Sequence, residues 1–142
     1  MKRLMITLGL SLFTVAAMAA DGLPVHKAPA DAQAYIIAPA DGAHVTSPFV
    51  VQFGLKGMGV APSGVDKPDT GHHHLLIDVG KLPPAGQPIV ADEHHVHFGG
   101  GQTQTTLTLP PGTHTLQLEL GDMHHVPFDP PVVSKKITVH VD

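Results

Sequence analysis

The chain has 142 residues, with 8 basic and 12 acidic side chains, 12 histidines and no cysteine. Its net charge of −4 offers no basic face for a phosphate backbone, so we expect no nucleic-acid partner. The lack of cysteine excludes thiolate catalysis, thiolate metal ligands and disulfide bonds, and it makes histidine the main candidate ligand for a transition metal.

Residues 1–20 have the pattern of a secretory signal peptide. Lys2 and Arg3 precede an apolar run that ends in the small-residue pattern Ala17-Met18-Ala19. We therefore expect cleavage near residue 19 or 20, export to the periplasm of a Gram-negative bacterium, and no stable membrane insertion. All 12 histidines follow this segment, so the mature protein would keep them.

The rest of the chain alternates short apolar stretches with turns rich in proline and glycine. Residues 21–34 are small and polar, and we expect them to form a flexible lead-in. Apolar alternation predicts strands over residues 35–37, 50–55, 72–79, 95–98, 103–109, 113–120 and 133–141. No window shows a helical period. We therefore predict one all-β domain over residues 35–142, an immunoglobulin-like antiparallel β-sandwich of about seven or eight strands.

Two H-x-H pairs on predicted strands form the main candidate site. Residues i and i+2 share a strand face, so His72 and His74 point the same way, as do His95 and His97. Their Cα atoms would lie roughly 6.6 Å apart, and leaning imidazoles can bring two nitrogens to the roughly 3.3 Å that one metal ion requires. If the two strands are adjacent, four imidazoles surround one ion; otherwise the pairs serve separate sites.

A third histidine cluster, Met123-His124-His125, follows the strand predicted over residues 113–120. Imidazole suits zinc and copper, and the Irving–Williams order favours Cu(II). We therefore predict a copper or zinc ion, and the predicted ligands are His72, His74, His95, His97 and His125. Because ligation needs neutral imidazole, affinity should fall as the pH drops through about 6.5.

Several other residues have predicted supporting roles. Asp69 and Asp78 are candidates to orient the imidazole rings, as carboxylates next to metal ligands commonly do. His114 shares an apolar strand face and is expected to be a core histidine with satisfied ring nitrogens. His73 lies on the opposite strand face from His72, where it either supports the ligands or is exposed. Residues 99–101 are three glycines, which permit a tight turn or bulge beside the second pair.

Four long segments resemble the DUF4399 family of bacterial exported proteins. The segments are GHHHLLID, HHVHFGGGQTQTTLTLPPGTHTLQLELGD, HHVPFDPPVVSKKITVHV and the opening APADGAHVTSPFVVQFGLKGMGVAP, and they cover roughly residues 37–141. The resemblance implies a small immunoglobulin-like β-sandwich in the cell envelope. By position, the family's histidines are His72, His73, His74, His95, His97 and His125. Phe128 stands where a second histidine of the last motif is expected, which weakens that motif as a ligand set.

The sequence favours a periplasmic, histidine-rich metal-binding protein for copper or zinc storage, delivery or protection, with an envelope protein as a candidate partner. One alternative is a cupin-like metalloenzyme, because His72, His74 and Asp78 approximate the pattern H-x-H-x3-E, with aspartate in place of glutamate. The other alternative is a non-metal interaction module of the envelope whose histidines sense pH. We expect a binding protein rather than an enzyme.

Overall fold

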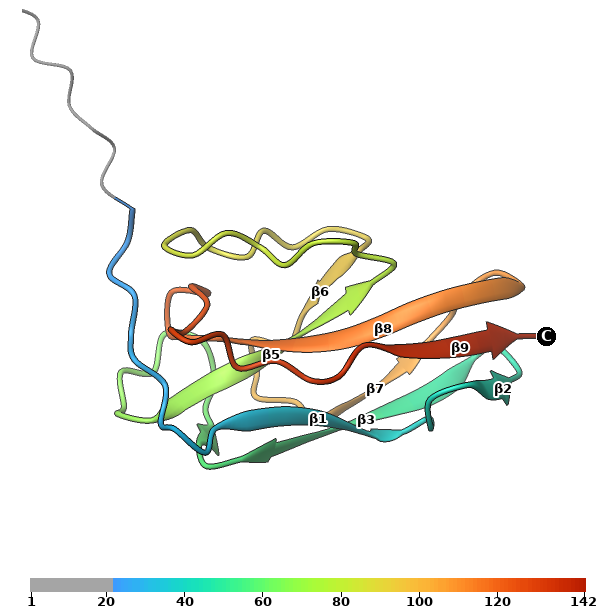
Figure 1. The fold of residues 1–142 in the computed structure, drawn as a ribbon, viewed down its shortest axis with the longest axis horizontal. Coiled ribbons are helices and arrows are strands. Elements are labelled where there is room, and N and C mark those ends of the chain that lie inside the picture. The colour runs from blue at the N-terminus through green and yellow to red at the C-terminus, as the bar shows by residue number, and fades with distance from the viewer. Residues whose placement is uncertain (1–21) are drawn as a thin grey trace, which may run out of the picture.

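The computed structural model describes residues 22–142 (Figure 1), so the predicted signal peptide over residues 1–20 lies outside the described residues. Residues 22–142 contain nine strands and no helix, as predicted for an all-β chain. The strands are β1 (Gln33–Ala38), β2 (Ala43–Val45), β3 (Phe49–Lys56), β4 (Gly59–Val60), β5 (Thr70–Ile77), β6 (His95–His97), β7 (Gln104–Leu107), β8 (Gly112–Gly121) and β9 (Ile137–Val141). The described part of the chain contains no helix that could cross a membrane.

The strands form two sheets of different size. The smaller sheet has the antiparallel order β1-β3-β7 and curls into a half-barrel. The larger sheet has the order β2-β9-β8-β5-β4, and β6 pairs with β5. β2 pairs with β9 in parallel, and so does β4 with β5. The larger sheet is therefore mixed, and the prediction of a purely antiparallel arrangement is wrong for these two pairs of strands.

The hydrophobic core lies between the two sheets. Alternate residues of the long strands supply it, because side chains on a strand point to opposite faces. Leu75 and Ile77 enter it from β5, Leu118 from β8, and Val51 and Phe53 from β3. The inward faces follow the predicted period of two.

β5 is buried on both faces along nearly its whole length, and so is the last part of β8, residues 118–121. The segment between β5 and β6 folds back over the face that points away from the core. Ile89 of that segment is buried, and its amide donates a hydrogen bond of 2.9 Å to the carbonyl of His125. Leu76 and Val126 are also buried but lie outside the main core. Polar residues on this outer face of β5 are consequently shielded from water.

The lead-in predicted over residues 21–34 is joined to the domain by main-chain hydrogen bonds. Leu23 donates to Gly86, Ala28 donates to Asp129, and Asp129 donates back to His26. β1 begins within this segment, at Gln33.

Candidate metal centre

The candidate centre is built on the outer face of β5. Alternation sends His72 and His74 to this face and sends His73 to the core, where its ring packs 5.3 Å from that of Phe53 between centroids. All three histidine side chains are fully buried. Alternation along β5 therefore places two candidate metal ligands on the outer face and a core histidine on the opposite face.

Strand pairing adds His97 to the pair. His74 lies directly opposite His97 of β6 and, on its other side, opposite Glu119 of β8. Residues paired in this way in antiparallel strands point to the same face. His97, His74 and Glu119 thus form one row across three strands. His72 lies in a neighbouring row, opposite Gly121.

Two glycines leave room for these rings. A Cβ atom at Gly121 would lie 2.7 Å from Cε1 of His74 and 3.2 Å from the main chain of His125. A Cβ atom at Gly99 would lie 2.3 Å from Cε1 of His97. Any side chain at either position would therefore occupy space that an imidazole ring now fills. Gly99 thus leaves room for the His97 ring, in addition to permitting the predicted turn.

The fourth histidine, His125, comes from the loop after β8. The Asp122 carboxylate accepts hydrogen bonds from the amides of His124 and Val126, at 2.8 and 2.9 Å. The φ angle of His125 is 67°, in the left-handed region that costs energy for a residue other than glycine. The His125 carbonyl accepts a hydrogen bond from the Ile89 amide. These bonds hold the strained backbone and aim the ring at β5.

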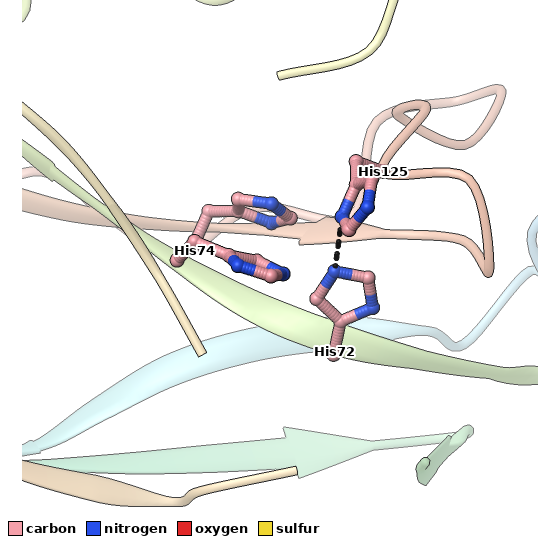
Figure 2. A group of neighbouring side chains, drawn as sticks. His72, His74 and His125 are labelled. Carbon is pink, nitrogen blue, oxygen red and sulfur yellow. Dashed lines mark hydrogen bonds between the residues drawn. The ribbon is translucent and has the colours of Figure 1, made fainter. Parts of the chain in front are cut away.

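The four rings converge on one point. His72, His74, His97 and His125 each offer one nitrogen, and these four nitrogens lie within 4.8 Å of one another. Figure 2 shows His125 above His72, with a dashed line that marks the hydrogen bond between the two rings. Nε2 of His72 lies 3.0 Å from Nδ1 of His125. That separation is close to the roughly 3.3 Å expected for two nitrogens on one zinc or copper ion. The arrangement can therefore supply four imidazole ligands to a single ion.

Burial favours the neutral form of three of the four rings. Burial is the larger cause and the neighbouring histidines of the cluster are the smaller one, and together they lower the pKa of His72 to about 4 and that of His74 to about 3. The pKa of His125 is also lowered, mainly by burial. Neutral imidazole is the form that binds metal. Protonation of these three rings would therefore compete with a metal ion only below the pH of about 6.5 that the sequence predicts.

Many ring nitrogens in the cluster have no hydrogen-bond partner in the protein. Within residues 22–142, this holds for Nδ1 of His72, both nitrogens of His74 and Nε2 of His97. Burying a polar atom without a partner is unfavourable, and such atoms need an explanation in a folded protein. A metal ion would accept one lone pair from each ring and remove much of this cost.

His95, the fifth predicted ligand, does not join the cluster. It faces the same side as His97, as predicted, but it lies opposite Leu76, one row further along β5. Its Nδ1 lies 2.8 Å from the Asp92 carboxylate. The structure therefore does not bring His95 together with the other four predicted ligands, because the H-x-H spacing defines a face but not the position along the neighbouring strand.

The two predicted supporting carboxylates also lie elsewhere. Asp78 hydrogen-bonds to Nδ1 of His114 at 2.7 Å and accepts the Thr115 amide at 2.8 Å. The other nitrogen of His114 reaches the Pro110 carbonyl at 2.9 Å, so this histidine is satisfied as expected, and Asp78 raises its pKa. Asp69 lines a surface pocket. Asp78, the acid of the cupin-like pattern, is therefore engaged outside the cluster.

Two buried groups near the cluster were not assigned a clear role from the sequence. His73 is fully buried, neither ring nitrogen has a protein partner, and burial lowers its pKa to about 4. Glu119 is fully buried with both carboxylate oxygens unpartnered, and burial raises its pKa to about 7. Alternation with Leu118 places Glu119 on the outer face of β8, which would ordinarily be exposed. Only the pairing of β8 with β5 places it beside His74.

Comparison with known proteins gives one match. A family model described as Domain of unknown function (DUF4399) matches residues 51–142, which is more than half of the chain and includes the four clustered histidines. No curated protein and no solved structure matches the chain. The resemblance seen in the sequence motifs is confirmed, and the chain belongs to the DUF4399 family.

Proposed function

We propose that this protein is a periplasmic metal-binding protein that holds one copper or zinc ion among four histidines, for storage, delivery or protection. The observation that carries the proposal is the convergence of four ring nitrogens within 4.8 Å of one another, from two strands and one loop. His72 and His125 approach to 3.0 Å although they are 53 residues apart in the chain. Imidazole donors without thiolates or carboxylates suit copper and zinc.

The number of ligands favours binding over catalysis. Structural zinc sites are closed by four protein ligands, whereas catalytic zinc sites keep a position open for water or substrate. Four imidazoles here would close a tetrahedral shell. His72 and His74 are fully buried, while His97 and His125 are partly exposed, so an ion would enter from the side of these two residues. A metalloenzyme would require one of the four rings to leave the ion or a further coordination position to open on it.

The alternative of a pH-sensing interaction module fits the cluster less well. A histidine sensor must change charge near neutral pH. Burial lowers the pKa values of His72 and His74 to about 4 and about 3, so both rings stay neutral well below that range.

Three further points belong to the proposal. The periplasmic location is supported by the signal-peptide pattern of residues 1–20. An immunoglobulin-like sandwich is supported by two facing sheets around one core, although the smaller sheet is curled. An envelope protein that delivers or receives the ion would be the partner.

The test is a metal titration of protein purified without a histidine tag, with copper and zinc added separately. We expect one tight equivalent. His72→Ala with His74→Ala should abolish this uptake while leaving the fold intact by circular dichroism.

The matched control removes two other histidines, His44→Ala with His140→Ala. These rings stack 4.9 Å apart at a site outside the cluster, and uptake should be unchanged. No tight uptake by the unsubstituted protein, or full uptake by the first double variant, would contradict the proposed function.

A further inference from the structure

Glu119 is placed next to the candidate metal centre by the strand register. It lies directly opposite His74, on the same face of the larger sheet. Cβ atoms of such partners are about 4.5–5.5 Å apart, so the side chains of Glu119 and His74 leave the sheet next to each other. Three strands therefore present His97, His74 and Glu119 in one row.

Glu119 is also the one buried carboxylate of residues 22–142 that has no protein partner. The other buried carboxylate, Asp122, accepts bonds from the amides of His124 and Val126 and pairs with His26 at 2.8 Å. Both oxygens of Glu119 are unpartnered, and no ion pair includes it among the described residues. A buried carboxylate without a compensating partner is unfavourable and calls for a functional explanation.

A metal ion in the cluster would supply the missing partner. Four neutral imidazoles leave the full charge of a divalent ion in a buried site, where charges interact more strongly than in water. Metal-bound histidines usually donate their second ring N–H to a carboxylate or carbonyl group, and His74 has both ring nitrogens unpartnered. We propose that Glu119 is the charge-compensating partner of a divalent ion held by the four histidines, acting through the ring of His74.

This inference rests on the proposed function and adds a preference to it. A carboxylate that balances charge stabilises a divalent ion more than a monovalent one. Imidazole also binds monovalent ions. The centre should nevertheless have a higher affinity for divalent ions, and this preference should depend on Glu119.

The test compares Glu119→Gln with the unsubstituted protein. The variant keeps the shape of the side chain and a hydrogen-bond acceptor but removes the charge. Its affinity for Zn²⁺ should fall by about 10–100-fold, the usual effect of losing a partner of a metal ligand. Its affinity for Ag⁺ should change much less. Affinities are measured by competition titration against a chelator of known strength.

The control is Glu93→Gln, the same change at an exposed carboxylate, which should leave both affinities unchanged. The thermal midpoint of the metal-free protein provides the structural readout. Glu119→Gln should not lower it, because the substitution removes no protein hydrogen bond. If Glu119→Gln does not fold, Glu119→Leu replaces it, because a buried polar group without partners can be replaced by an apolar one at little cost.

Five outcomes are possible. A selective loss of Zn²⁺ affinity with an unchanged metal-free midpoint supports the inference. Equal losses for both ions, or no loss, overturn it and leave the proposed function standing. A Zn²⁺ loss that accompanies a lower metal-free midpoint assigns Glu119 a structural role and also overturns it. If the unsubstituted protein binds neither ion, the proposed function and this inference both fail.

Discussion

At the scale of single residues, three consecutive histidines have two different surroundings. His72 and His74 face the cluster, whereas His73 packs against Phe53 in the core. All three are buried, and burial lowers their pKa values to about 4, 3 and 4, respectively. Each ring is therefore uncharged at pH 7, whether it faces the cluster or packs in the core.

These pKa shifts predict that the metal-free protein loses stability in acid. The folded-state pKa values lie below the ordinary value of 6.5, so the unfolded chain binds more protons between pH 6.5 and about 4. The contribution of these rings to stability is complete above pH 6.5 and is lost as the pH falls through that window. Each ring contributes up to about 1.4 kcal/mol per pH unit. Glu119 has the opposite shift, and its contribution is lost as the pH rises through about 7.

The measurement is urea unfolding of the metal-free protein at pH 7, 6 and 5. His73→Phe is the matched variant, because it keeps an aromatic ring against Phe53 and removes one titrating group. It should flatten the pH dependence by about one proton and leave metal uptake unchanged. A free energy of unfolding that does not change over this range would contradict the assigned burial.

At the scale of elements, the register of β5 with its neighbours decides which side chains meet. Strand alternation in the sequence correctly predicted that His72 and His74 share a face and that His95 and His97 do so as well. It did not predict that His97 lies opposite His74 while His95 lies opposite Leu76. Register depends on loop lengths and on packing across the sheet, and neither can be read from an H-x-H motif.

The same limit explains why Glu119 was missed and why the sheet was expected to be antiparallel. Alternation in β8 assigns Glu119 to the face opposite the core, and nothing local shows that the segment around Ile89 covers that face. The parallel strands β2 and β4 are only 3 and 2 residues long, too short to leave a pattern in the sequence. His125 was predicted as a ligand from its cluster, although the loop geometry that aims it was not.

Gly121, which lies opposite His72 in the strand pairing, gives a prediction about the space left for the His74 ring. Gly121→Ala should weaken metal affinity by about tenfold or more, because its Cβ atom would lie 2.7 Å from the His74 ring and displace it. Gly80→Ala is the control, since a Cβ atom there meets nothing within 4 Å. Both variants are compared by zinc titration, and an unchanged affinity for Gly121→Ala would mean that the His74 ring position is not needed for binding.

At the scale of the whole molecule, the centre joins parts of the chain that are distant in sequence. β5, β6 and the loop after β8 each contribute histidines to the cluster, and Ile89 connects the intervening segment to His125. The chain has no cysteine, so its stability depends on packing and on any ion it binds. A metal in the cluster would act as a cross-link between these elements.

Metal binding should therefore raise the thermal midpoint. Ligand that binds only the folded state adds about 2.7 kcal/mol at a free concentration of 100 times Kd. We expect Zn²⁺ to raise the midpoint of the unsubstituted protein and of the His44→Ala, His140→Ala control, and a chelator to reverse the rise. The His72→Ala, His74→Ala variant should show no shift. Equal shifts in both double variants would indicate binding outside the cluster.

The most direct test of the central claim is X-ray absorption spectroscopy of the metal-loaded protein, purified without a tag. We predict four nitrogen neighbours at about 2.0–2.1 Å from zinc, with the outer-shell scattering of imidazole rings. The number of imidazoles should fall in the His72→Ala, His74→Ala variant if any metal remains. A first shell made mainly of oxygen, or one with fewer than three imidazoles in the unsubstituted protein, would contradict a centre formed by His72, His74, His97 and His125.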